Sequence, residues 1–220
     1  MQNPTTLELR RPNPYSIEVW LNRPDVRNAF NETVIAELTQ VFLDIARNDQ
    51  LRVVVLAAHG KAFCAGADLN WMQAMSGYSW DQNRADAQQL ADMLWTLDQC
   101  PVPIVGRVQG DCYAGGMGLA SVCDVLVAVD TMQFCLSEAR LGLMPATISP
   151  YVVRAMGVQA SRRYFVTAER FTAQQAFAMG MVHEVCAAEQ LNSVIAQHVH
   201  QLSGYGAMHV CSPSVAGQPK

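Results

Sequence analysis

The chain has 220 residues, half of them hydrophobic, and a formal net charge of −4. That length suits one large domain or two small ones with a sizeable core. Charges of both signs are interspersed, so there is no basic patch for nucleic acid, and no apolar run approaches the ~18 residues of a membrane span. The start, MQNPTTLELRR, lacks the apolar core of a secretory signal. We therefore expect a cytoplasmic protein without nucleic-acid or membrane partners.

The seven cysteines predict neither disulfides nor a metal site. Their number is odd, and no two are spaced as C-x-x-C. Most lie in apolar sequence, where a reduced thiol packs like a small hydrophobic side chain. We expect buried, reduced cysteines and no bound metal.

Strands and helices are predicted to alternate along the chain. Residues 15–22 alternate in polarity in their first part, as a half-buried strand does. Asn31 is a good N-cap for a helix that continues to about Ala46, and residues 51–60 read as a buried strand. Residues 61–72 form a loop of small residues, in which Asp68 caps a short helix. Later elements are a helix over 81–99, a strand over 104–110, a short helix over 117–122, a strand over 123–130, a short strand with a loop after it, and helices near 148–157 and 159–167.

The alternation predicts an α/β fold. Near the end, Thr172 and Gln175 form a capping box, and Gly180 suits the C-terminal cap of the same helix. Residues 204–220 are small, polar and aperiodic. We therefore divide the chain into a core over 1–203 and a divergent or disordered tail over 204–220.

The stretch CYAGGMGLAS, residues 112–121, has the features of a backbone binding site for a negative oxygen. It has two adjacent glycines and no side chain that acts as acid, base or metal ligand. Amides in the first turn of a helix have no partner within the helix, and glycine allows a ligand to approach them closely. The earlier loop CAGAD can supply a second amide. One such donor contributes ~3 kcal/mol to a transition state that carries an oxyanion.

The pair of loops FCAGADL and GDCYAGGMGLA resembles the crotonase family, also called the enoyl-CoA hydratase/isomerase superfamily. LNRPDVRNAFN resembles the coenzyme A segment of that family, SEARLGLMPATISPYVVRAMG its second catalytic segment, and FTAQQAFAMGMVHEV its late helix-strand unit. The resemblance covers residues 6–203 and looks closest to bacterial methylglutaconyl-CoA and carboxygeranoyl-CoA hydratases. It implies a crotonase-like ββα spiral core with a shortened C-terminal helical part.

The resemblance implies three catalytic positions. The backbone amides of Ala67 and Gly115 match the two donors that hold the thioester oxygen. Glu138 matches the second glutamate of the family, which exchanges a proton with the acyl group. The first glutamate of many hydratases falls on Gly118, so that acid is missing.

The missing acid leaves three functions open. The first is an enoyl-CoA hydratase, in which Glu138 and an ordered water add water across the 2,3 double bond. The second is a double-bond isomerase, because one base can remove a proton and return it. The third is a catalytically silent protein that binds acyl-CoA.

The resemblance also implies the binding residues and partners. No cofactor is expected apart from coenzyme A as part of the substrate. The family forms trimers, so a homotrimer or a dimer of trimers is expected if the short C-terminus permits it. Matching coenzyme A positions are Arg27, Ala29, Phe30, Ala65 and Asp68, and the acyl pocket is expected to include Trp71, Tyr113, Met117 and Pro145.

Overall fold

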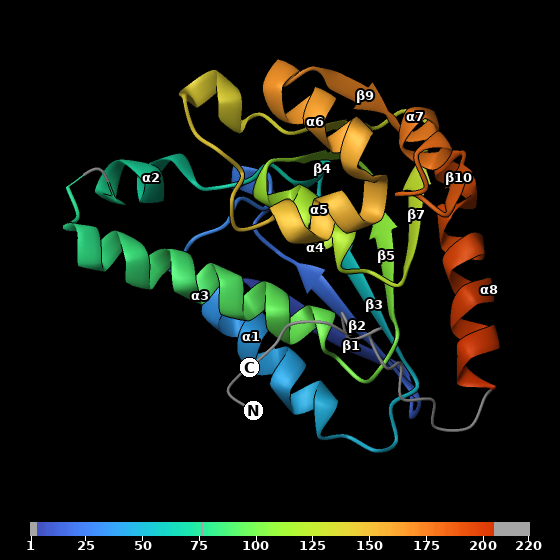
Figure 1. The fold of residues 1–220 in the computed structure, drawn as a ribbon. Coiled ribbons are helices and arrows are strands. Elements are labelled where there is room, and N and C mark those ends of the chain that lie inside the picture. The colour runs from blue at the N-terminus through green and yellow to red at the C-terminus, as the bar shows by residue number, and fades with distance from the viewer. Residues whose placement is uncertain (1–3, 76, 205–220) are drawn as a thin grey trace, which may run out of the picture.

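The computed structural model describes residues 4–75 and 77–204, which form a mixed α/β fold with two sheets (Figure 1). The larger sheet has the strand order β1 (Leu7–Asn13), β2 (Ser16–Leu21), β3 (Val53–Ala58), β5 (Ile104–Val108), β7 (Val125–Val129) and β10 (Glu184–Cys186). The smaller sheet has the order β4 (Ala62–Cys64), β6 (Asp111–Tyr113), β8 (Gln133–Cys135) and β9 (Arg170–Thr172). One edge strand of each sheet, β1 and β9, is antiparallel to its neighbour, and the other pairs are parallel.

From β3 to β8, consecutive strands go to different sheets, and helices follow each pair. The pairs are β3 with β4, β5 with β6, and β7 with β8. The longer helices are α1 (Glu32–Ala46), α3 (Trp80–Asp98), α5 (Ser149–Met156), α6 (Val158–Thr167) and α8 (Leu191–Ser203), and the shorter ones are α2 (Leu69–Met75), α4 (Gly115–Ser121) and α7 (Ala173–Ala178). This repetition confirms the predicted ββα spiral.

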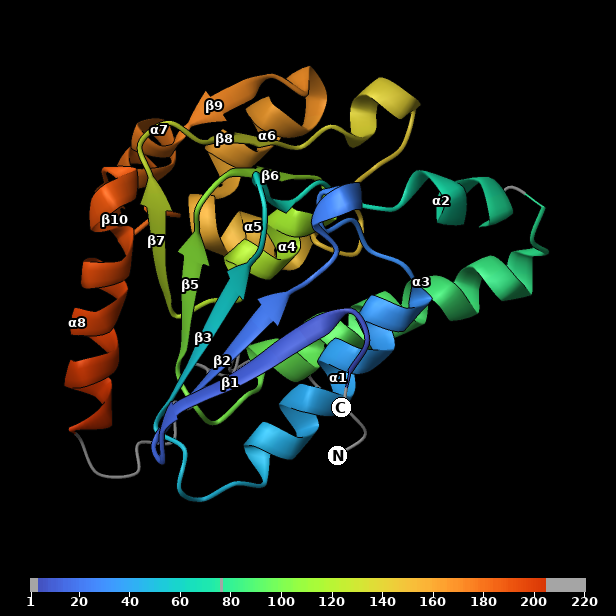
Figure 2. The same cartoon turned by 180° about the vertical axis from the view of Figure 1, so that it is seen from behind.

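The helices cover the larger sheet unevenly. Helices α1 and α3 pack side by side against one face, and α2 projects from the body with the start of α3 (Figure 1). Seen from behind, α8 lies along the other face, where it contacts β3, β5 and β7 (Figure 2). No helix in the described part of the chain is both long and apolar enough to cross a bilayer.

Local sequence signals explain where several helices begin and end. The Asn31 side chain accepts a hydrogen bond from the Val34 amide at 3.0 Å and so caps α1, as predicted. The predicted capping box at the start of α7 is also present, with Gly180 just beyond that helix at φ +83°. Helix α3 begins at Trp80, one residue earlier than expected, because Ser79 forms a capping box that the sequence analysis overlooked.

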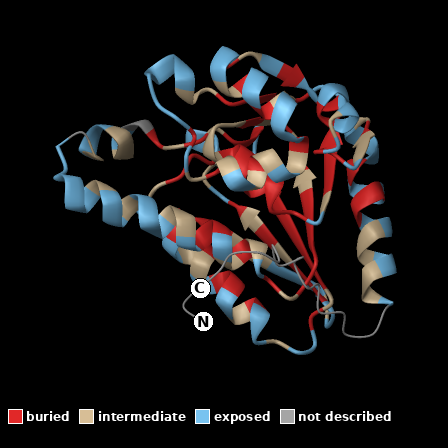
Figure 3. Cartoon of the chain, in the orientation of Figure 1, coloured by how far each residue is buried: buried red, intermediate tan, exposed pale blue. Residues whose placement is uncertain are grey.

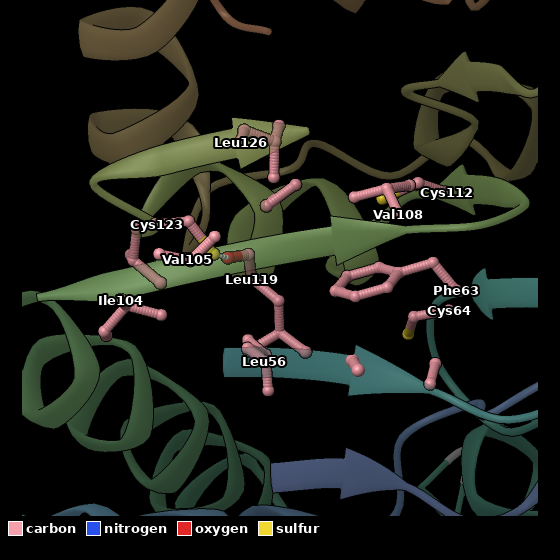
Figure 4. Close-up of a cluster of buried hydrophobic side chains, with 14 of the residues drawn as sticks. Leu56, Phe63, Cys64, Ile104, Val105, Val108, Cys112, Leu119, Cys123 and Leu126 are labelled. Carbon is pink, nitrogen blue, oxygen red and sulfur yellow. Dashed lines mark hydrogen bonds between the residues drawn. The ribbon is translucent and has the colours of Figure 1, made fainter. Parts of the chain in front are cut away.

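The core lies between the strands and the helices that follow them (Figure 3). Leu119 of α4 points between β3 and β5, close to Leu56 and Val105 (Figure 4). Cysteine side chains also belong to this core. The six in the described residues are buried and unpaired, as expected, and Cys211 lies outside those residues.

Two short strands, β4 and β6, were not predicted from the sequence pattern. Residues 62–64 were expected in a loop but form β4, and the strand expected over 104–110 ends at Val108 before the chain enters β6. Directly before these two strands, the backbone at Gly110 lies against the backbone at Lys61. A Cβ on Gly110 would lie 2.0 Å from the Lys61 carbonyl oxygen. Three-residue strands carry no periodicity, which is why the sequence pattern missed them.

Candidate active site

The candidate catalytic segments follow three neighbouring parallel strands of the smaller sheet. Ala67 lies in the loop after β4, Gly115 follows β6, and Glu138 comes three residues after β8. The order β4-β6-β8 places these strand ends next to one another. Because ligands in parallel sheets bind beyond the carboxyl ends of the strands, this edge is where a site is expected.

The first two loops approach each other closely. Gly66 has φ +94°, a conformation that favours glycine, and a Cβ on it would lie 3.6 Å from the Gly115 nitrogen and 2.8 Å from the Ala114 Cβ. A Cβ on Gly115 would in turn lie 3.9 Å from the Gly66 Cα and 2.9 Å from two ring carbons of Phe30. The glycines therefore allow two stretches of backbone to come together.

The geometry leaves the two candidate amides without an internal acceptor. Phe30 donates to the Gly66 carbonyl at 2.7 Å and accepts from the Asp68 amide at 2.8 Å, which makes a parallel bridge with Ala67. In such a bridge the central residue directs its own N–H away from the partner. Gly115 is the first residue of α4, and within the described residues neither its amide nor that of Ala67 donates a hydrogen bond.

The residue before Gly115 has an unusual backbone conformation. Ala114 has φ +48° and ψ −120°, which is costly for a residue with a Cβ. Its amide donates to the Cys135 carbonyl at the end of β8, at 2.8 Å. This bond ties the turn that presents the Gly115 amide to the strand that leads to Glu138.

Glu138 is a partly buried carboxylate with an unused oxygen. It begins the 3-10 turn Glu138–Leu141, and its Oε2 is buried without a hydrogen-bond partner in the described part of the chain. Burial raises the pKa of Glu138. Such an arrangement costs stability, and it is common where a carboxyl group exchanges protons with a ligand.

The place of the missing acid is filled by an aliphatic side chain. A Cβ on Gly118 would lie 2.6 Å from the Ile148 Cγ2 and 3.4 Å from the Leu94 Cδ1. Ile148 directly precedes α5 and is buried. No side chain at position 118 fits unless Ile148 moves.

Two of the predicted coenzyme A residues line one cavity. Arg27 and Ala65 lie on its wall, and the Ala65 amide donates to the Arg27 carbonyl at 3.0 Å. The cavity has a volume of about 240 Å³. Its wall also contains Lys61 and Tyr113, which the sequence analysis did not assign to coenzyme A. Lys61 stands three residues before Cys64, the first residue of the CAGAD segment.

The other three predicted coenzyme A residues hold the loops together. The Ala29 carbonyl accepts from Arg23 at 2.7 Å, and both backbone groups of Phe30 are used in its bridge. Asp68 pairs with Arg23 at 2.9 Å and caps α2, as predicted, by accepting from the Asn70 amide. Burial opposes ionisation of Asp68, but these hydrogen bonds hold its pKa below the usual value.

The four predicted acyl-pocket residues are not brought to one cavity. Trp71 of α2 packs partly against the core, and Met117 of α4 is fully buried within it. Pro145 lines an apolar cavity of about 330 Å³ with residues of α6, whereas Tyr113 lines the cavity that contains Arg27. A shared acyl pocket for these residues stays a prediction.

The fold and the two converging loops define a crotonase-like α/β protein. The sequence profile described as enoyl-CoA hydratase/isomerase matches residues 16–211. The chain belongs to this family.

Solved structures and relatives agree with this assignment. A putative enoyl-CoA hydratase/isomerase from Legionella pneumophila is 35% identical, with a TM-score of 0.88 over 92% of this chain and 78% of that one. An enoyl-CoA hydratase from Shewanella pealeana is 40% identical, also with a TM-score of 0.88, over 93% and 76%. The enoyl-CoA hydratase AKT6-1 of Alternaria alternata is 34% identical over 87% of this chain and 62% of its own length. The chain spans about three-fifths of the length of such curated relatives.

Proposed function

We propose that the chain is an enoyl-CoA hydratase that uses a single carboxylate. The observation that carries this proposal is the neighbouring position of the ends of β4, β6 and β8. The segments that follow these strands bear two backbone amides and a buried carboxyl oxygen that have no hydrogen-bond partner within the described residues. The family and the names of its members support an acyl-CoA thioester as the substrate.

In the proposed reaction, Glu138 serves both proton transfers. Its carboxylate accepts a proton from a water molecule as the water oxygen bonds to C3 of the enoyl group. The electron pair of the double bond moves toward the thioester, whose oxygen becomes negative and is held by the amides of Ala67 and Gly115. Glu138 then gives a proton to C2, which completes the 3-hydroxyacyl thioester and restores the carboxylate.

A double-bond isomerase is the second candidate, because Ile148 fills the space that a second acid would occupy. For this reaction Glu138 removes a proton from C2 of a 3-enoyl thioester and returns it to C4. The same enolate and the same two amides serve both reactions. The side chains of Ile148 and Leu94, which lie nearest to Gly118, are aliphatic and cannot orient a water molecule.

Product analysis separates the candidates. The purified chain is incubated with a 2-enoyl and a 3-enoyl coenzyme A thioester, and the products are identified by mass and chromatography. A 3-hydroxyacyl thioester from the 2-enoyl substrate supports the hydratase, whereas a shifted double bond without added water supports the isomerase. Binding without conversion of either substrate contradicts both and supports the silent protein.

A further inference from the structure

A second cavity lies on the face of the larger sheet along which α8 runs. It has a volume of about 560 Å³. Strands β2, β3 and β5 contribute Trp20, Val55 and Arg107 to its wall, and α8 contributes residues between Asn192 and Ser203. None of its wall residues comes from the loops that carry the three candidate catalytic residues. The cavity is therefore separate from the candidate active site.

Arg107 is a half-buried cation in this cavity. It belongs to β5, which has a strand on each side, and a charged side chain at such a position is normally paired. Its Nε and Nη2 donate to the Asn192 Oδ1 at 3.2 and 2.9 Å, but an amide carries no charge. In the part of the chain that the structure describes, Arg107 forms no ion pair. Burial lowers the pKa of Arg107, so its charge is poorly compensated and an anion would stabilise it.

The carboxylates on this face already have partners. Glu18 Oε2 accepts a hydrogen bond from the Trp20 Nε1 at 2.7 Å, and Glu8 pairs with Arg10 at 2.6 Å. The guanidinium groups of Arg10 and Arg107 lie 4.6 and 5.1 Å from the centre of the Trp20 ring. Glu18 attracts Arg107 without forming an ion pair with it. Arg107 is therefore the cation of the wall that can accept a new partner.

The wall next to Arg107 is apolar over the length of a short hydrocarbon chain. Asn192, Ile195, Ala196 and Val199 lie on one face of α8, with Val55 of β3 also in the wall. Two helical turns separate the first and the last of these α8 residues, which is ~10 Å and matches an extended chain of about eight carbons. The planar guanidinium at the start of this stretch matches the two oxygens of a carboxylate.

We propose that this cavity binds an unbranched, medium-chain carboxylic acid, with its carboxylate on Arg107 and its chain between α8 and Trp20. The ligand is the free acid, so it differs from the thioester of the proposed reaction. The site uses none of the groups that this reaction needs, and its existence does not depend on that reaction.

Calorimetry of the purified chain with octanoate tests the anchor. Hydrogen bonds to a charged group are strong, so Arg107→Gln should raise the Kd for octanoate about 10- to 100-fold. Arg84→Gln is the matched control, because Arg84 is also an arginine over a tryptophan, 5.6 Å from the centre of the Trp80 ring, but lies outside the cavity wall. Its Kd should equal that of the wild type.

A second variant and two further ligands complete the test. Ala196 is exposed on α8, and glutamate suits a helix, so Ala196→Glu should fold normally and compete with the ligand for Arg107. Octan-1-ol lacks the charge and inorganic phosphate lacks the chain, so each should bind at least about tenfold more weakly than octanoate. The inference is overturned if the wild type does not bind octanoate, if both cavity variants bind it unchanged, or if either further ligand binds equally well. No turnover is measured, so failure of the proposed reaction would leave this result intact.

Discussion

Replacing Glu138 by glutamine should lower activity and raise stability at the same time. The variant keeps the shape of the side chain but removes the charge of the carboxylate, whose Oε2 is buried and has no hydrogen-bond partner among the residues that the structure describes. If Glu138 moves the protons, turnover of a 2-enoyl thioester should fall by ~10²–10⁴. A structural carboxylate would give the opposite stability effect, because its loss would remove favourable contacts.

The size and pH dependence of the stability gain follow from the burial of this carboxyl group. Its pKa in the folded protein lies above the unfolded value of 4.5, so the folded state holds the proton more tightly. The wild type therefore has its full stability below pH 4.5 and loses some as the pH rises through the folded pKa. A buried polar group without a partner costs ~1–3 kcal/mol, and part of this remains for the neutral amide. We expect Glu138→Gln to gain about 1 kcal/mol at pH 8 and almost nothing near pH 4.5.

Urea unfolding at a series of pH values, with turnover measured on the same preparations, checks both effects. Glu189→Gln is a suitable control, because this glutamate is exposed and lies before α8, in the turn Ala188–Gln190. A variant that is less stable than the wild type at pH 8 would refute the account of an unpaired buried charge. Full activity would refute the catalytic role.

Three further substitutions test the packing around the site. Gly118→Ala should lower the free energy of unfolding by ~1–3 kcal/mol, because the new methyl group overlaps Ile148. Most of that loss should vanish when Ile148 is also replaced by alanine, and additive effects of the two substitutions in a double-mutant cycle would contradict the overlap. Asp68→Asn should destabilise the protein by ~2–3 kcal/mol. That loss should be present at pH 7 and disappear as the pH falls below 3.8, because the folded pKa of Asp68 is lowered, and a constant difference in acid unfolding curves would count against the ion pair. Asn28→Ala should lower the free energy of unfolding by ~2–4 kcal/mol, since this buried side chain forms hydrogen bonds with three backbone groups. An unchanged midpoint of thermal unfolding would exclude that role.

The long elements were predictable from the sequence because their signals are local. The apolar spacing and Asn31 defined α1 almost to the residue, and the buried strand β3 followed from its β-branched run. The strands β4 and β6 were not predictable from pattern, because three residues have no period. Their existence depends on backbone contacts across the chain, such as that between Gly110 and Lys61.

The candidate site was predictable only in part, for a related reason. The motif match proposed Ala67, Gly115 and Glu138 as site residues, and the strand order explains how their three distant segments become neighbours. The role of Ile148 next to Gly118 and the cavity that contains Lys61 depend on tertiary packing. No spacing in the sequence encodes such contacts.

The thiol of Cys64 provides a built-in reporter of opening at this edge of the fold. It lies at the end of β4, directly before the loop of Ala67, and is completely buried. A Cβ on Gly116 would lie 2.7 Å from the Cys64 carbonyl oxygen and 2.8 Å from its Cβ, so α4 seals this residue. Burial raises the pKa of Cys64 to about 12, which keeps the sulfur in its unreactive form. An alkylating reagent can therefore label Cys64 only after the packing around β4 opens, and such opening would also separate the backbone segments of Ala67 and Gly115.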